Sequence, residues 1–400
     1  MRSRSAVVAA LALMAAFVPH ASAKGPAPHW VGAWQASPES GGGASTDKSF
    51  RQSVHASLGG STLRLRFSNA YGDRPVTLQS ISIALPVGGQ PAQAIDPGTV
   101  TLVAKKLVIP AGQDVYSPTV SFPVPADGWI TVSFFAPGSF PKTTHHNVGM
   151  TTTWKTLDGV GDQTADPSGA AFVTPGIDYT YLSAMDVVGP KQLRTVVALG
   201  DSITDCCYSA PDTNKRWTDL LNERLAAAPG PRRFVVTNSA MSGNNVSNDR
   251  DGNQDQGAAG VTRIVRDVFD EPNVSTVIVY EGINDVGTDV PAATIEAAYE
   301  KILAMAHARG IRVVIATLTP CKDAYAGGGS YVSAAPVRDQ VNAWIRAHRS
   351  QFDGLIDFDR TVDSPLDARS WNPRYQFDGL HPNPLGLQAM ADSVPLSVLG

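Results

Sequence analysis

The sequence lacks an excess of positive charge. It has 32 lysines and arginines against 36 aspartates and glutamates, a formal net charge of -4 over 400 residues. Without a basic surplus there is no electrostatic case for binding nucleic acid. The composition, 43% apolar and 17% charged, excludes a disordered or fibrous chain. Since 400 residues exceed a typical single core, we expect two domains.

Cysteine is scarce, with only Cys206, Cys207 and Cys321. No histidine or carboxylate cluster accompanies them in the sequence, so we expect no metal and no cofactor. In an oxidising compartment the simplest arrangement is one disulfide and one free thiol, with Cys206 or Cys207 joined to Cys321. The alternative, that all three are reduced and partly buried, stays open.

A long apolar run occurs only near the N-terminus. Arg2 and Arg4 precede an apolar stretch at residues 6–18, and residues 21–23 form a small-residue cleavage site. This pattern predicts a secretory signal peptide at residues 1–23, with an apolar core too short for a confident membrane span. We therefore expect a soluble protein that is secreted or periplasmic, with no stable membrane insertion. The sequence leaves the oligomeric state open.

Residues 24–190 have the pattern of an all-β sandwich. Leu63, Leu65 and Phe67 alternate with polar residues, the period of a half-buried strand. Further short strands are expected at residues 76–78, 80–84, 100–104, 119–122 and 129–135. The β pattern begins near Ser53, and residues 24–50 are rich in glycine, proline and serine instead. Many short strands separated by turn residues predict an antiparallel sandwich.

Residues 191–400 follow a different pattern, in which short apolar runs alternate with amphipathic helices. Strands are expected at residues 195–199, 234–237, 276–280, 312–318 and 355–358. Helical spacing occurs at residues 217–225, 261–269, 295–302, 337–345 and 384–393. Five strands with helices between them predict an α/β fold with a doubly wound parallel sheet.

The first strand of this half ends at Gly200, Asp201 and Ser202. In an open α/β sheet, ligands bind at the carboxyl ends of the strands. A serine held there on a tight turn is well placed to be a nucleophile. A serine turn without chemistry is the alternative on this stretch alone.

A serine hydroxyl needs a base, and histidine is the usual one. Of eight histidines, His381 follows the last predicted strand in a loop, and Asp378 precedes it by three residues. One tight turn could bring this carboxylate onto the imidazole, where it would select the tautomer and stabilise the imidazolium. The pair His145 and His146 is interpreted as a surface loop, with a place in the active-site wall as the alternative.

Two further stretches after strands offer donors for an oxyanion. Gly243 could present a backbone N–H with no side chain in the way, and Asn284 could present a neutral side-chain amide. Each stretch alone is compatible with an ordinary turn. Together with Ser202, Asp378 and His381 they make the arrangement that acyl transfer needs.

These stretches resemble the conserved blocks of the SGNH hydrolases, also called the GDSL esterase/lipase family. The blocks lie at residues 200–202, 242–244, 282–285 and 378–381, in the family's order, and the resemblance covers about residues 193–400. It implies a flavodoxin-like three-layer α/β/α catalytic domain. Residues 24–190 resemble, less specifically, the β-sandwich of a secreted bacterial two-domain subgroup. The adjacent Cys206 and Cys207 depart from the family pattern.

The resemblance also implies the roles of the site residues. Ser202 would be the nucleophile, His381 the base and Asp378 the acid that orients it. The Ser202 N–H, the Gly243 N–H and the Asn284 side chain would form the oxyanion hole.

The function that we expect is a secreted serine esterase acting on a small-molecule or polysaccharide ester, with a short acyl or acetyl group. One alternative is a carbohydrate esterase that deacetylates plant polysaccharide while the β domain binds glycan. The other is a binding protein without catalysis.

Overall fold

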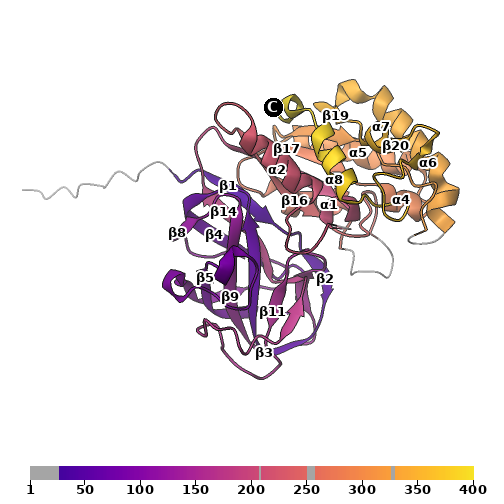
Figure 1. Ribbon diagram of the computed structural model, residues 1–400. Coiled ribbons are helices and arrows are strands. Elements are labelled where there is room, and N and C mark those ends of the chain that lie inside the picture. Colours follow the sequence, from indigo (N-terminus) through magenta and orange to yellow (C-terminus); the bar gives the residue numbers. More distant parts are fainter. Residues whose placement is uncertain (1–26, 207–208, 250–256, 326–328) are drawn as a thin grey trace, which may run out of the picture.

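The computed structural model describes residues 27–206, 209–249, 257–325 and 329–400, so the predicted signal peptide lies outside the described residues. Figure 1 shows an antiparallel β region, drawn from indigo to magenta, beside an α/β region drawn from rose-red through orange to yellow. The predicted fold class is confirmed. The predicted boundary at residue 190 falls between the last strand of the β region and the first strand of the parallel sheet.

The α/β region is built on a five-stranded parallel sheet in the order β16-β15-β17-β18-β19. This is the flavodoxin-like order 2-1-3-4-5, in which the ligand site lies beyond the carboxyl ends of the strands. The strands are β15 (Arg194–Gly200), β16 (Phe234–Ala240), β17 (Val274–Tyr280), β18 (Arg312–Ala316) and β19 (Gly354–Ile356). All five predicted strands are confirmed, because continuous runs of valine, isoleucine and leucine are typical of strands covered on both faces.

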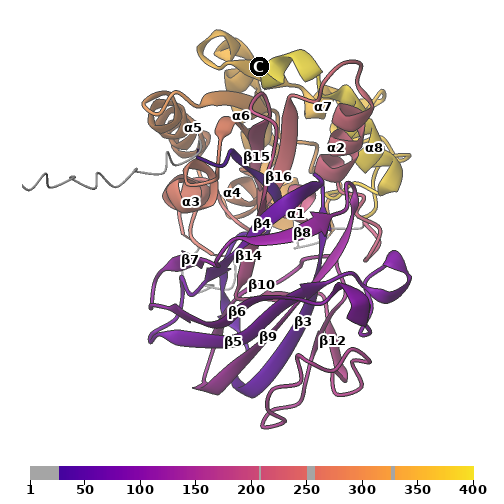
Figure 2. The same cartoon turned by 90° about the vertical axis from the view of Figure 1, so that its left-hand side faces the viewer.

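Helices cover both faces of this sheet, as Figure 2 shows. One face carries α2 (Trp217–Ala227), α7 (Phe358–Val362) and α8 (Pro384–Ser393). The other carries α3 (Gly260–Ile264), the π-helical turn η4 (Val265–Phe269), α5 (Ala292–His307) and α6 (Gly329–Ala347). Two short helices, α1 (Ser202–Asp205) and α4 (Ile283–Gly287), follow β15 and β17 directly. A small hairpin, β20 (Asp363–Ser364) and β21 (Asp367–Trp371), precedes α8.

The β region consists of three antiparallel sheets. The first contains β1 (Trp30–Gln35), β14 (Leu182–Val188), β4 (Gly60–Ser68), β7 (Asp114–Tyr116) and β8 (Val120–Val124). The second contains β12 (Thr174–Gly176), β11 (Thr153–Lys155), β3 (Ser45–Ala56), β9 (Gly128–Phe140), β5 (Val76–Ala84) and β6 (Thr101–Ile109). The third contains β13 (Tyr179–Thr180), β10 (Thr143–His146) and β2 (Glu39–Gly42). One buried apolar core joins the two large sheets, with the ring of Phe67 edge-on to that of Phe134.

The sequence pattern failed over residues 24–50. Residues 30–50 contain β1, β2 and the first half of β3, where no individual strand was predicted. The reason is that β2 and β3 bury polar residues, such as Glu39, Arg51 and Gln52, so neither shows an apolar alternation. The pattern also divided β5 in two, because a bulge with a left-handed backbone at Ser80 interrupts its alternation.

The two regions share a polar, tightly fitted boundary. The N–H of Gly32 in β1 donates to the Thr195 hydroxyl in β15 over 3.2 Å. The buried Arg66 of β4 forms an ion pair of 2.5 Å with the buried Glu271 of the α/β region. None of the helices that the structure describes combines the length and the apolarity that a bilayer crossing requires.

Candidate active site

The hydroxyl of Ser202 stands at the carboxyl end of β15, on the first residue of α1. Asp201 caps this helix, because its carboxylate accepts the N–H of Ile203 over 3.0 Å. Burial raises the pKa of Asp201 to about 7, although the bond from Ile203 works against this rise. Because its carboxylate holds the first turn of α1 in this way, Asp201 is a structural cap. The serine beside it is buried but not sealed, with 7% of its surface exposed.

His381 joins Ser202 to Asp378 in an unbroken hydrogen-bonded line. The Nε2 of His381 lies 3.0 Å from the Ser202 Oγ, and its Nδ1 lies 2.8 Å from the Asp378 Oδ2. The other oxygen of Asp378 accepts the N–H groups of Leu380 and His381, which fixes the carboxylate. The structure thus brings together the three residues predicted from two distant stretches of the sequence.

The turn that carries this pair depends on Gly379. Its backbone is left-handed, with φ at 78°, and a Cβ there would lie 2.1 Å from the Asp323 carbonyl oxygen. Burial would raise the pKa of Asp378, but the hydrogen bond and the charge of His381 outweigh burial and lower it to about 2. Asp378 is therefore ionised at any pH at which an esterase works.

The two predicted oxyanion stretches follow the strands on either side of β15. Gly200 pairs in register with Ala240 of β16 and Tyr280 of β17, so the three strands end at one level. Gly243 adopts a left-handed backbone, with φ at 76°, in the loop after β16. Asn284 lies on the first turn of α4 and donates its Nδ2 to the Asn244 carbonyl over 3.0 Å. This bond ties the two predicted donors into one wall.

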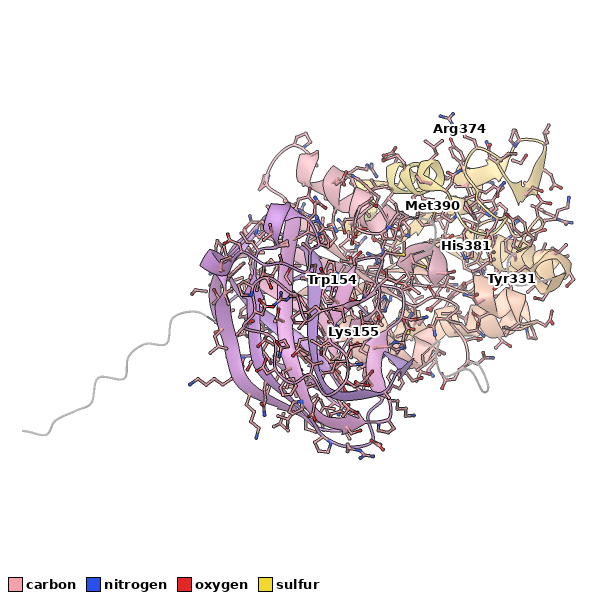
Figure 3. The ribbon with its side chains drawn as sticks, turned by 60° about the horizontal axis from the view of Figure 1, so that its bottom comes forward. Trp154, Lys155, Tyr331, Arg374, His381 and Met390 are labelled. Carbon is pink, nitrogen blue, oxygen red and sulfur yellow. The ribbon has the colours of Figure 1, made fainter. Side chains whose placement is uncertain are left out.

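A tyrosine that the sequence pattern did not single out completes this wall. The Tyr331 hydroxyl, on α6, donates to the Asn284 Oδ1 over 2.8 Å. With its oxygen engaged there, the amide of Asn284 must direct its nitrogen the other way, toward the loop of Gly243. Figure 3 shows Tyr331 and His381 within the α/β region, away from Trp154 and Lys155 of the β region.

Asp285 belongs to the family-like block at residues 282–285, to which the sequence analysis gave no separate role. In the structure it stabilises the fold. Its carboxylate accepts the backbone N–H groups of Val246 over 2.8 Å and Ser247 over 3.0 Å. The loop that bears Gly243 is therefore held at both ends, by Asn284 and by Asp285. A carboxylate that accepts two adjacent N–H groups would be read from sequence only as an ordinary turn residue.

Arg263, on α3, supports the carboxyl ends of the strands that carry the site. The sequence pattern did not identify it. The side chain is buried and donates to the carbonyls of Gly200 and Ser239, over 3.1 and 2.6 Å. It also donates to the Asn244 Oδ1 over 2.9 Å and to the Glu281 carboxylate over 2.9 Å. One guanidinium thus joins the ends of β15, β16 and β17, since its five donors suit several acceptors at once.

The interpretation of His145 and His146 as a surface loop is wrong. Both lie in β10, and His146 is 3% exposed. The His146 Nδ1 lies 3.1 Å from the Glu39 Oε1, and its Nε2 lies 3.0 Å from the Asp205 Oδ1. These three buried groups are also a possible donor set for a metal ion. Each carboxylate contacts a different nitrogen of the ring, so the three groups form an ion triad.

The predicted disulfide to Cys321 is wrong. Cys321 carries a free thiol, and Cys206 is disulfide-bonded, while Cys207 lies outside the described residues. The two described cysteines face different neighbours: the Cys206 Sγ is 3.0 Å from the Ser242 Oγ, and the Cys321 thiol faces the Tyr331 carbonyl at 3.5 Å. Burial raises the pKa of the Cys321 thiol to about 11.

The match to a known protein family falls in the α/β region. Residues 198–389 match the model of the GDSL-like Lipase/Acylhydrolase family. No curated protein matches the chain. Similar solved structures cover about half of it. A GDSL-like lipase from Bacteroides thetaiotaomicron VPI-5482 is 16% identical, with a TM-score of 0.38, over 52% of this chain and 90% of that one.

Two further solved structures also match about half of this chain. A carbohydrate acetylesterase family member from Sinorhizobium meliloti is 16% identical, with a TM-score of 0.42, over 52% of this chain and 97% of that one. TesA is 22% identical, with a TM-score of 0.37, over 52% of this chain and 98% of that one.

Proposed function

Because the C-terminal half of the chain carries a domain of the GDSL-like lipase/acylhydrolase family, a family of ester hydrolases, we propose that Ser202, His381 and Asp378 cleave carboxylic esters through an acyl-enzyme. The observation that carries this proposal is the line of contacts from the Ser202 Oγ to the His381 Nε2 at 3.0 Å and from Nδ1 to Asp378 at 2.8 Å. A nucleophile, a base and an orienting acid in this order form the arrangement that activates a serine hydroxyl.

The first step is attack of the Ser202 Oγ on the ester carbonyl carbon. His381 accepts the hydroxyl proton at Nε2, and the ionised Asp378 stabilises the imidazolium through Nδ1. The carbon–oxygen bond to the alcohol then breaks, and His381 returns the proton to the leaving oxygen. A water molecule, deprotonated by His381, attacks the acyl-enzyme and releases the carboxylic acid and the free serine.

Both steps pass through a tetrahedral intermediate with a negative oxygen. We propose that the Ser202 N–H, the Gly243 N–H and the Asn284 Nδ2 donate to this oxygen. All three follow strands that end at one level, and Tyr331 orients the amide of Asn284. Donors fixed in advance stabilise the charge as it forms, and each is typically worth about 10²- to 10³-fold in rate.

The proposal is tested with Ser202→Ala, which removes the attacking oxygen and leaves a small residue in the same turn. We expect hydrolysis of p-nitrophenyl acetate to fall to background, and labelling by a fluorophosphonate probe to be lost. The matched control is Ser393→Ala at the end of α8, whose hydroxyl donates within that helix, to the Met390 carbonyl. Undiminished turnover by Ser202→Ala contradicts the proposal.

The substrates that we propose are short-chain acyl or acetyl esters. A second candidate is removal of acetyl groups from a polysaccharide, and one observation favours it: the β region borders the stretch that follows the nucleophile. Asp212 accepts hydrogen bonds from the Thr152 N–H and hydroxyl, and its own N–H donates to the Met150 carbonyl. The β region could therefore hold part of a polymer near Ser202.

One substrate panel separates the two candidates. Acetate release from acetylated xylan and from p-nitrophenyl acetate is compared with hydrolysis of p-nitrophenyl esters of increasing acyl length. Preference for the polymer at equal acetyl concentration supports the polysaccharide substrate. Equal rates on small acetate and butyrate esters, with none on xylan, favour a general short-chain esterase.

We also propose that the protein is secreted or periplasmic, as in the secreted bacterial two-domain subgroup of the family. The signal-peptide pattern at residues 1–23 supports this location, and so does the disulfide at Cys206, since disulfides persist in oxidising compartments. N-terminal sequencing of the exported protein should show cleavage after Ala23. Accumulation of the uncleaved chain in the cytoplasm would contradict the proposal.

A further inference from the structure

The β region inserts one charged side chain beside the nucleophile helix. His146, from β10, is 3% exposed and reaches Asp205, which is the last residue of α1 and three residues after Ser202. Its Nε2 lies 3.0 Å from the Asp205 Oδ1. On the other side of the ring, Nδ1 lies 3.0 Å from the Ser37 carbonyl oxygen and 3.1 Å from the Glu39 Oε1.

This geometry determines the protonation of the ring. A carbonyl oxygen and ionised carboxylates only accept hydrogen bonds, so each nitrogen of His146 must donate. A neutral imidazole donates from one nitrogen only, and His146 is therefore an imidazolium. Burial opposes that charge, but the carboxylates of Asp205 and Glu39 outweigh burial and raise the pKa of His146 to about 10.

Asp205 passes this contact on to the oxyanion loop. Its second oxygen, Oδ2, accepts the backbone N–H of Ser242 over 3.0 Å and the Ser242 hydroxyl over 3.1 Å. Ser242 directly precedes Gly243. The carboxylate therefore connects His146 to the loop that bears a proposed oxyanion donor, and it does so from the helix that bears the nucleophile.

Neighbouring contacts hold the same junction. The Arg216 side chain donates to the Asp205 carbonyl oxygen and, over 2.6 Å, to the Gly149 carbonyl oxygen of the β region. The Ser37 hydroxyl lies 2.9 Å from that of Ser239, in β16. The backbone around Asp205 is thus fixed, and its carboxylate has little freedom to find another partner.

We propose that His146 is a positioning residue for ester hydrolysis: through Asp205 it aligns Ser242 and hence the Gly243 N–H with the oxyanion that forms on Ser202. This inference rests on the proposed function, and it makes the β region part of the catalytic machinery. Without His146, a buried carboxylate would lose its only cationic partner among the described contacts, and such a charge is costly to leave unpaired. The unpaired charge would strain the junction around Asp205 and loosen its hold on Ser242.

The test compares His146→Gln with His145→Gln in the full-length protein. His145 is the neighbour on the same strand and bonds to the Ser40 carbonyl, away from α1. We expect His146→Gln to lower kcat on p-nitrophenyl acetate by about 10- to 100-fold with KM within twofold, and to slow fluorophosphonate labelling in parallel. The control should keep both constants. A folded His146→Gln with kcat within twofold of wild type overturns the inference.

Asp205→Asn is the second variant, and it decides the case if His146→Gln does not fold. Its amide oxygen can still accept the Ser242 N–H, but the ion pair is gone. We expect kcat to fall in Asp205→Asn as well, and the double variant to be more active than His146→Gln alone, because it leaves no unpaired charge. Wild-type kcat in Asp205→Asn overturns the inference.

Hydrogen exchange measures the positioning itself without relying on turnover. In His146→Gln we expect faster amide exchange in a peptide covering residues 238–249, and unchanged exchange in peptides of α5 and β18. Unchanged exchange over residues 238–249 overturns the inference even if the rate falls. If wild type hydrolyses no ester, the proposed function fails, and the exchange result still decides whether His146 holds this loop.

Discussion

The Tyr331 hydroxyl and the Asn284 Oδ1 lie 2.8 Å apart, and this contact determines which way the amide of Asn284 faces. The nitrogen of the same amide donates to the Asn244 carbonyl over 3.0 Å. An amide with both ends engaged cannot flip without breaking two hydrogen bonds. The proposed oxyanion donor is therefore oriented before substrate arrives, which is what makes such a donor effective.

Tyr331→Phe should slow ester hydrolysis without weakening substrate binding. The variant keeps the ring, which packs against Gly287, and removes only the hydroxyl. A net hydrogen bond is worth about 0.5–1.5 kcal/mol, so we expect kcat to fall by about 2- to 12-fold, with KM unchanged. Tyr325→Phe, which loses an exposed hydroxyl bonded to the Phe377 carbonyl, is the matched control. Equal kcat in the two variants would contradict the orienting role.

Asp378→Asn should lower kcat by about 10³- to 10⁴-fold, because an amide at this place favours the wrong tautomer of His381. The expected signature is a loss in kcat with little change in KM, measured on p-nitrophenyl acetate across pH 5–9. Asp289→Asn, at an exposed position, is the control. A loss smaller than tenfold would mean that a different carboxylate supports the histidine.

Asp201→Asn should change how stability depends on pH. Burial raises the folded-state pKa of Asp201 to about 7, above its value in the unfolded chain, so folding takes up a proton between about pH 4 and pH 7. Over that window the folded state binds more protons, and the contribution of Asp201 to stability falls as pH rises, by at most about 1.4 kcal/mol per pH unit.

An asparagine at this position keeps the acceptor for the Ile203 N–H and cannot ionise. The stability of Asp201→Asn relative to wild type should therefore be greater at pH 8 than at pH 5, measured by urea unfolding at both values. If the difference between the two proteins is the same at pH 5 and pH 8, Asp201 does not titrate as inferred.

Arg263→Met should destabilise the α/β region strongly. The substitution leaves the Glu281 carboxylate buried without its partner and leaves two strand-end carbonyls without a donor. Breaking a buried ion pair in this way typically costs about 3–5 kcal/mol, which chemical unfolding would show directly. Arg360→Met removes an exposed cation from α7 and should change stability by about 0.5 kcal/mol or less. Similar losses for the two variants would contradict this account.

The fold of the α/β region could be predicted because its signals are local. Each strand is a continuous apolar run, and α8 begins at Pro384 with Asn383 capping the Gly386 N–H, a signal that lies wholly within the sequence. Residues 24–50 carry no such signal, since the strands they form are stabilised by pairing and by buried polar contacts with distant segments. Only tertiary structure shows those partners.

The same contrast between local signals and tertiary contacts holds for the residues of the candidate site. Ser202, Gly243 and Asn284 could be found because each follows a strand whose carboxyl end faces the same edge of the sheet. His381 could be found through the carboxylate of Asp378 three residues before it, although α7 and the hairpin of β20 and β21 separate it from β19, the strand that the sequence places before it. Arg263 could not, because an arginine in an amphipathic helix normally lies on the surface and nothing nearby in the sequence indicates its burial. His146 and Asp205 are separated by five strands, β11 to β15, and lie in different regions, so their pairing depends on how those regions pack.

The pairing of β1 with β14 has a consequence for the order in which the chain acquires its structure. The first and last strands of the β region lie side by side, so that sheet closes only once residue 188 is available. The parallel sheet comes later in the sequence and includes a contact with residue 399, whose carbonyl accepts the Thr276 hydroxyl over 2.8 Å. A chain delivered from its N-terminus can therefore finish the β region first, since domains fold as units in the order in which they emerge. The α/β region then folds against a surface of the β region on which His146 and Arg66 are already in place.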